Sequence, residues 1–297
     1  MNLRGIGIFL GLNYLLVFLL AFVFLSEGAL AFQRPNLFQY LLQAAMMGIP
    51  ALCAVIARHF SPDELGDLPP IWPIPGVAAA RVTVLAPVLF AITCGLATLL
   101  GFTTPQWNLA GLLNRVGEHM SAPLPPEAAA IAPGVTLVFY PIISILVGAT
   151  LFAFIALGSE IGWRSYLMPR LLPLGKIPAC LIGGLCWGLW FLPFIYGWYR
   201  ETGEAGMGGT MLRTIALAIA LGAVLTQIVQ RTRNLGIAAL ALGAFAGQAS
   251  GIWDHLFQQQ TPPWTGTAGL ISIAVWCLAA CIPWLYAPNI GTDAVKN

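Results

Sequence analysis

Two ionisable residues, Glu160 and Arg164, lie among long apolar runs and have the spacing of a partnered pair. They belong to the segment Ser-Glu-Ile-Gly-Trp-Arg-Ser-Tyr-Leu-Met-Pro-Arg-Leu, which spans residues 159–171. A charged side chain at bilayer depth costs about 2.5–3.5 kcal/mol on insertion scales, so such residues are candidates for a functional site. Residues four apart share a helix face, and Glu on the N-terminal side is the favourable orientation. The pair is either a catalytic carboxylate beside a cation or a structural ion pair.

The elements that must position this pair are membrane-spanning helices. Of the 297 residues, 59% are hydrophobic and 8% are charged, and the mean hydropathy is +0.84, whereas a soluble domain has about 25% charged residues. We expect an all-α polytopic membrane protein that forms a single transmembrane domain over residues 1–297. Apolar runs of about 20 residues, long enough to cross a bilayer, predict eight spans: 5–25, 38–57, 78–101, 135–157, 178–197, 210–230, 235–253 and 268–287.

The basic residues predict the orientation of these spans. If the N-terminus is cytoplasmic, nine of the 13 Lys and Arg residues fall on the cytoplasmic side and four on the outside. Because cytoplasmic loops carry the excess of Lys and Arg, we expect both termini to be cytoplasmic and the protein to be integral to the plasma (inner) membrane.

Composition also excludes several classes of partner and cofactor. The net charge is +2, and no basic cluster with interleaved aromatic residues is present, so we expect no nucleic-acid partner. All six cysteines fall in apolar spans, where they behave as small hydrophobic residues, and they show no Cys-x-x-Cys spacing. We expect no bound metal and no cofactor.

The segment 159–171 is followed by a second distinctive run, Trp-Gly-Leu-Trp-Phe-Leu-Pro, at residues 187–193. Together they resemble the CPBP family of intramembrane proteases, which includes CAAX prenyl endopeptidases and bacteriocin-immunity proteins. That family has a first motif Glu-Glu-x-x-x-Arg, a second commonly written Trp-Gly-Leu-Trp-His-Leu-Pro, and a third with His four residues before Asn. The resemblance covers roughly residues 135–253 and implies the CPBP fold for this core.

The resemblance fails at the positions that carry the family's catalytic side chains. Residues 235–253, where the third motif is expected, contain neither His nor Asn. The replaced positions are Ser159 for the first Glu, Phe191 for the His of the second motif, Leu242 or Gly243 for the His of the third, and Ala246 or Gly247 for its Asn.

These replacements remove the groups that hydrolysis needs. Cleaving a peptide in a membrane requires an activated water and a positioned base, which the resemblance assigns to the converging Glu, His, His and Asn. A metal-dependent version would need about three protein ligands and a water. Glu160 alone would be a weak base while Arg164 holds it ionised. We expect a catalytically degenerate protein in which these two residues are motif remnants that form a structural pair.

The charges of the first motif also predict a junction between two spans. The fourth span ends near Leu157, and the basic residues Arg164, Arg170 and Lys176 follow on the predicted cytoplasmic side. Long basic side chains near helix ends extend toward the interface. The simplest structural interpretation is a basic junction at the membrane surface, partly neutralised by Glu160.

Small residues recur every four positions along the seventh span. Such a stripe lines one helix face and allows another helix to approach closely. We therefore expect a packing seam in place of the third motif, formed by Ala239, Gly243, Gly247 and Gly251.

His255 and Asp254 form a possible displaced site at the end of the seventh span. His255 precedes Gln259 by four residues, a faint echo of the third motif. It lies about twelve residues beyond the expected position, roughly 18 Å along a helix. An interfacial His paired with Asp254 is the plainer interpretation.

Three functions remain open. The preferred one is a binding, scaffolding or regulatory protein, surrounded by lipid, whose former substrate cleft holds a membrane helix or a lipidated peptide of a partner. The alternative is an active endopeptidase that cleaves prenylated or membrane-embedded peptides with a centre rebuilt from Glu160, His255 and Asp254. The third is a small-molecule transporter, suggested by scattered polar residues in the spans. Proximity of Glu160 to His255 distinguishes the first two.

Overall fold

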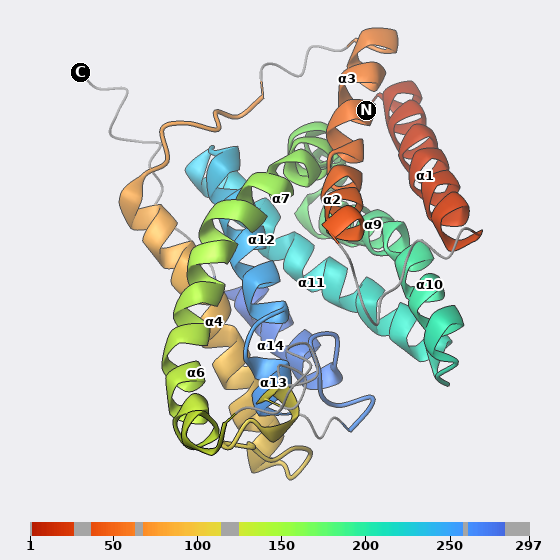
Figure 1. Cartoon of the computed structure of the whole chain (residues 1–297). Coiled ribbons are helices and arrows are strands. Elements are labelled where there is room, and N and C mark those ends of the chain that lie inside the picture. Colours follow the sequence, from red (N-terminus) through yellow and green to blue (C-terminus); the bar gives the residue numbers. More distant parts are fainter. Residues whose placement is uncertain (1, 27–36, 63–67, 114–124, 258–260, 283–297) are drawn as a thin grey trace.

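The computed structural model describes residues 2–26, 37–62, 68–113, 125–257 and 261–282. Within these ranges the regular secondary structure is entirely helical (Figure 1). The N-terminal helices are α1 (Leu3–Ser26), α2 (Leu37–Met46), α3 (Ile49–Phe60) and α4 (Gly76–Leu99).

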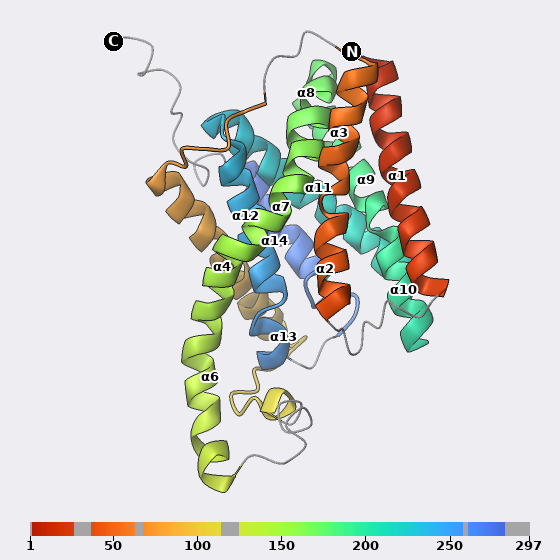
Figure 2. The same cartoon turned by 45° about the horizontal axis from the view of Figure 1, so that its top comes forward.

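A single helical run continues from Pro126 to Leu174. It changes its hydrogen-bonding pattern along its length, and π-helical turns occur twice. Figure 2 shows α6, α7 and α8 of this run following one another from one end of the molecule to the other. The run comprises α6 (Pro126–Val147), the π-helical η1 (Gly148–Phe152), α7 (Ala153–Glu160), the π-helical η2 (Ile161–Leu167), α8 (Met168–Leu171) and the 3₁₀-helical η3 (Leu172–Leu174).

The C-terminal half adds helices that pack against part of this run. The start of α12 is fixed by Asn234, whose side-chain oxygen accepts a hydrogen bond from the backbone N–H of Ile237 at 3.0 Å, an N-cap. Most residues of α12 are buried, which places it centrally in the bundle. The helices are α9 (Lys176–Trp190), α10 (Leu192–Thr202), α11 (Met207–Thr232), α12 (Leu235–Ala249), α13 (Trp253–Leu256) and α14 (Leu270–Cys281).

The all-α membrane-protein prediction is confirmed. Each of the eight predicted runs falls on helix, although residues 283–287 of the last run lie outside the described ranges. Six helical segments are long and apolar enough to cross a membrane, and two others, Ala44–Phe60 and Leu270–Cys281, are shorter apolar helices. The chain is therefore an integral membrane protein with at least six candidate spans.

The predicted basic junction after Leu157 is wrong. The helix continues through the motif and ends only at Gly175, whose φ of 101° is a conformation that favours glycine. Arg164 and Arg170 are 4% and 1% exposed, so they do not extend toward the interface. Both are held by local contacts. Arg164 pairs with a carboxylate, and Arg170 Nη1 donates a hydrogen bond to the Tyr166 carbonyl oxygen at 2.6 Å while its guanidinium lies 3.6 Å from the centroid of the Tyr166 ring.

Glycines bring the helices around the motif into close contact. A Cβ atom at Gly184 or Gly188 of α9 would lie 2.5 or 2.7 Å from the Cα atoms of Ile219 and Ile215 on α11. These positions therefore let the two backbones approach within a distance that any other residue would prevent. The contact holds α9, which carries the second motif, against α11.

Candidate functional site

Glu160 and Arg164 form a buried ion pair inside the helical run. Arg164 Nη1 lies 3.2 Å from Glu160 Oε1, and their side chains are 3% and 0% exposed. The pairing follows from the spacing of four residues, which places the end of α7 beside the first turn of η2. Neither carboxylate oxygen of Glu160 has a hydrogen-bond partner among the described residues. The guanidinium is therefore the group that balances this buried charge.

Arg164 also connects the first motif to the second. Its guanidinium carbon lies 4.1 Å from the centroid of the Trp187 ring, which projects from α9. A cation over an indole face is stabilised by about 2 kcal/mol or more when both are removed from water. Arg164 is thus positioned between a carboxylate on its own helix and an aromatic ring on the next, which is an arrangement that fixes the side chain.

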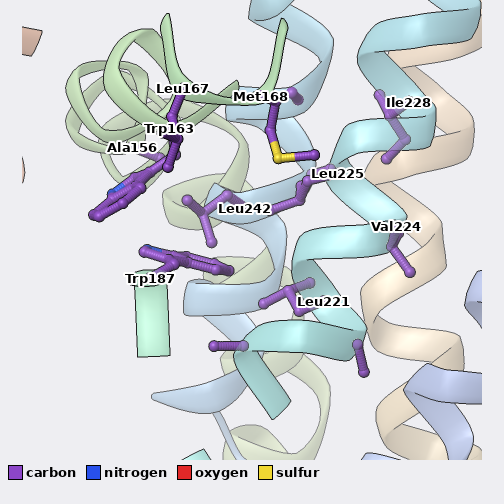
Figure 3. Packing of buried hydrophobic residues seen from close by; sticks show 14 of the residues in the cluster. Ala156, Trp163, Leu167, Met168, Trp187, Leu221, Val224, Leu225, Ile228 and Leu242 are labelled. Atoms are coloured by element: carbon purple, nitrogen blue, oxygen red, sulfur yellow. The ribbon is translucent and has the colours of Figure 1, made fainter. Parts of the chain in front are cut away.

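Leu242 of α12 faces this arrangement with an apolar side chain. Figure 3 shows Leu242 lying among Trp163, Trp187, Met168 and Leu225, and it is 5% exposed. Leucine can neither accept a proton nor coordinate an ion, so this wall of the site is chemically inert.

Phe191 completes the apolar surroundings of the second motif. It lies at the break between α9 and α10, where its ring centroid is 5.0 Å from that of Trp190 and 5.8 Å from that of Trp187. The Trp190 indole is held in place because its Nε1 donates a hydrogen bond to Asn13 Oδ1 of α1 at 3.1 Å. Aromatic packing therefore occupies the position where a base is required.

The remaining third-motif positions lie at a helix contact. A Cβ atom at Gly243 would clash with the backbone of Gly148 and Ala153, and one at Gly247 would clash with the carbonyl oxygen of Ser144. The carbonyl oxygen of Gly247 and Ser144 Oγ would similarly crowd a Cβ at Gly251, at 2.9 and 3.1 Å. The other predicted members of this stripe and motif are Ala239, which is buried, and Ala246, which is partly buried.

The partners of this seam on the helical run were not predicted. Ser144 and Gly148 are small residues four positions apart, as are those of the stripe on α12. This spacing is the sequence signal from which their contact with α12 could have been predicted. Together the two stripes bring α12 against α6, η1 and α7. We call this contact, formed by Ser144, Gly148, Gly243 and Gly247, the glycine seam.

Both motifs lie in a segment of the chain that matches a known protein family. Residues 141–246 match the family model described as type II CAAX prenyl endopeptidase, Rce1-like. Over these residues the chain is similar to the Rce1-like CAAX prenyl endopeptidases. The predicted resemblance is confirmed, and the matched segment includes both motifs and lies within the predicted core of 135–253. No curated protein and no solved structure gives a significant match.

His255 lies far from Glu160. The His255 ring is 5.9 Å from the ring of Tyr140 on α6. Glu160 is twenty residues further along the same helical run, which corresponds to about 30 Å at 1.5 Å per residue. Asp254 is exposed beside His255 on α13. The structure therefore does not bring together the three residues of the rebuilt centre.

Ser159 lies next to Glu160, at the position of the first Glu of the family's first motif. Ser159 is 1% exposed, and its hydroxyl has no hydrogen-bond partner among the described residues. In the ranges that the structure describes, no three His, Cys, Asp or Glu side chains gather in a way that would hold a metal ion. A metal-activated water would require such a group.

A narrow pocket lies beside Arg164, between η2, α9 and α11. Its cavity volume is about 10 Å³, which is room for about one water molecule. Its walls are small or apolar at most positions, since Gly183, Gly184 and Gly222 line it together with Trp163 and Met168. We call this space the motif pocket.

Proposed function

We propose that this protein is a catalytically degenerate CPBP-family membrane protein that acts as a binding, scaffolding or regulatory protein. The observation that supports this most directly is that the motif carboxylate, Glu160, is wholly buried and already paired with Arg164 at 3.2 Å. Because its side chain is 0% exposed, this carboxylate does not contact the water that a general base would have to activate.

The surroundings of the pair support the same proposal. The side chains that face it from the second and third motifs are Trp187 and Leu242, and neither can move a proton. His255, the candidate replacement base, lies about 30 Å away along the helical run. Among the described residues, the two motifs offer no base other than Glu160 for peptide hydrolysis.

The proposed ligand is an apolar segment of a membrane partner. The motif pocket, at about 10 Å³, has room for about one water molecule and is far smaller than the roughly 300–1,000 Å³ typical of drug-sized ligand sites. An apolar side chain of a membrane helix, or the end of the lipid chain on a lipidated peptide, would therefore enter it by displacing the side chains that line it. Gly183, Gly184 and Gly222 in its walls would allow such a group to approach the backbone closely.

A cleavage assay tests the proposal. Purified protein in mild detergent would be incubated with a prenylated peptide and with a membrane-embedded peptide, beside the variant Glu160→Ala. We expect no cleavage by either protein. The exposed residue Glu204 provides the matched control Glu204→Gln, and size-exclusion chromatography verifies that each variant is folded. Cleavage by the wild type that disappears in Glu160→Ala, but not in Glu204→Gln, would establish the endopeptidase alternative instead.

A crosslinking experiment tests the binding role separately. A photoreactive amino acid at Phe191, beside Trp187, would be activated in native membranes. We expect a stoichiometric protein or lipidated-peptide adduct. Adducts with lipid alone would contradict the binding proposal, and net passage of a small solute through the purified protein in vesicles would favour a transporter.

We further propose that the protein resides in the plasma (inner) membrane with both termini in the cytoplasm. The support is the distribution of Lys and Arg in the sequence. With this orientation the exposed Lys176, after the motif helix, faces the cytoplasm, and the exposed Glu204, between α10 and α11, faces the outside.

A further inference from the structure

The motif pocket beside Arg164 has the size of a single water molecule. Its cavity volume is about 10 Å³, and a buried water needs about that much space together with about two to four polar partners. Glu160 is not among the residues that line it. The pocket is therefore separate from the carboxylate, and its own polar groups decide what it can hold.

Arg164 brings hydrogen-bond donors to this pocket. A guanidinium carries several N–H groups, and Arg164 Nη1, although it lies 3.2 Å from Glu160 Oε1, makes no hydrogen bond with any described residue. Its Nη2 lies beside Gly222 of α11, where a Cβ atom would be 3.5 Å from this nitrogen. Gly222 lines the pocket and has no side chain that could accept a hydrogen bond. The guanidinium thus reaches the pocket wall with donors to spare.

Thr226 brings an acceptor to the same pocket. It lies one turn after Gly222 on α11, lines the pocket and is 4% exposed. Its hydroxyl donates its hydrogen to the Gly222 carbonyl oxygen at 2.7 Å. With that hydrogen engaged, the oxygen can take part in a further hydrogen bond only as an acceptor.

Trp163 is a second lining residue with an unpartnered donor. It is 2% exposed, and its Nε1 has no hydrogen-bond partner among the described residues. Buried polar atoms are nearly always hydrogen-bonded. Unpartnered donors on both Arg164 and Trp163 therefore point to a small ligand that accepts hydrogen bonds.

We propose that the motif pocket binds one water molecule, which accepts a hydrogen bond from Arg164 and donates one to Thr226 Oγ1. A halide ion could also accept from Arg164, but it could not donate to Thr226, and Glu160 already balances the charge of the guanidinium. Bridging waters are enthalpically nearly as good as direct hydrogen bonds. The water connects η2 to α11, and this role is independent of the proposed function because it needs neither a partner nor a reaction.

Radiolytic labelling of the full-length protein in detergent tests the proposal. A short X-ray pulse makes hydroxyl radicals from water, and inside a protein these radicals oxidise the side chains that lie beside a bound water. Met168 is the reporter, because it lines the motif pocket, is 5% exposed, and its sulfur would lie 2.6 Å from a Cβ at Gly183 in the same wall. Met46, which is 1% exposed and does not line this pocket, is the control. We expect Met168 to be oxidised several-fold faster than Met46, as measured by mass spectrometry.

Gly222→Ala fills the pocket with a methyl group. The new Cβ would lie 3.5 Å from Arg164 Nη2 and 3.8 Å from the Cα atom of Gly184, which are ordinary contact distances between lining residues. The methyl group therefore fits without moving these atoms and takes the place of the water. Oxidation of Met168 should fall to the level of Met46.

Thr226→Val keeps the shape of the side chain and removes the acceptor. It should lower the oxidation of Met168 several-fold. Thr93→Val is the matched control, because Thr93 on α4 is also buried and its hydroxyl donates to the carbonyl oxygen four residues earlier, that of Leu89, at 2.8 Å. Thr93 does not line the motif pocket, so this variant should leave the oxidation of Met168 unchanged.

Three results would overturn the proposal. One is oxidation of Met168 no faster than that of Met46. Another is oxidation of Met168 that neither Gly222→Ala nor Thr226→Val lowers. The third is oxidation that falls when gluconate in the buffer is replaced by chloride, since a halide ion would then occupy the pocket. If Gly222→Ala does not fold, Thr226→Val alone decides whether the water lies in this pocket.

Discussion

Removing the cation from the buried ion pair should destabilise the protein strongly. In Arg164→Met the carboxylate of Glu160 remains wholly buried, and neither of its oxygens has another partner among the described residues. Leaving a buried charge unpaired costs about 3–5 kcal/mol. The double variant Glu160→Met with Arg164→Met removes both charges, which is often neutral for stability. It still loses the contact between Arg164 and Trp187, so we expect a deficit of about 2 kcal/mol.

Unfolding in mixed micelles with increasing sodium dodecyl sulfate, followed by tryptophan fluorescence, would measure these free energies. Arg200→Met, which removes an exposed Arg on α10, is the matched control and should change stability by less than about 0.5 kcal/mol. The expected order of stability is wild type and control first, then the double variant, then Arg164→Met. A single variant as stable as the control, or a double variant no more stable than the single one, would refute a structural role for the pair.

Two further predictions concern the glycine seam and the orientation. Gly243→Ala should destabilise the protein by about 1–3 kcal/mol, because its Cβ meets backbone atoms that cannot move aside, whereas Gly95→Ala on α4, where a Cβ meets nothing within 4 Å, should not; equal unfolding free energies would contradict the seam. In a background without native cysteines, Glu204→Cys should react with a membrane-impermeant maleimide in intact cells, and Lys176→Cys only after permeabilisation. The reverse pattern would show that the termini are outside.

The helices and the pairing of Glu160 with Arg164 could be predicted from the sequence because both depend on local properties. An apolar run of about 20 residues predicts a membrane span, and a spacing of four residues predicts that two side chains share a helix face. Glu160 and Arg164 are paired as that spacing predicts. Neither inference requires knowledge of which helices are neighbours.

The burial of the basic residues of the first motif could not be predicted from the sequence in this way. Three basic residues near a predicted helix end favoured a junction at the interface, yet Arg164 and Arg170 are buried. The contacts that hold them depend on the shape of the helix: Arg164 pairs with a carboxylate one turn away, and Arg170 contacts the ring and the carbonyl oxygen of Tyr166. The pocket formed by the end of α4, α13 and the start of α14 was likewise not predicted, because its lining comes from segments that are far apart in the sequence.

Packing, rather than sequence, distinguishes the two registers of the third motif. Adjacent helix positions differ by about 100° in direction, so the sequence alone left Leu242 and Gly243 equivalent. In the structure Gly243 lies at the glycine seam, where any side chain would clash with Gly148 and Ala153, whereas Leu242 faces Trp163 and Trp187. The seam therefore sets the rotation of α12, and that rotation presents a leucine to the ion pair. A histidine at position 242 would face the site, and one at position 243 would separate the helices.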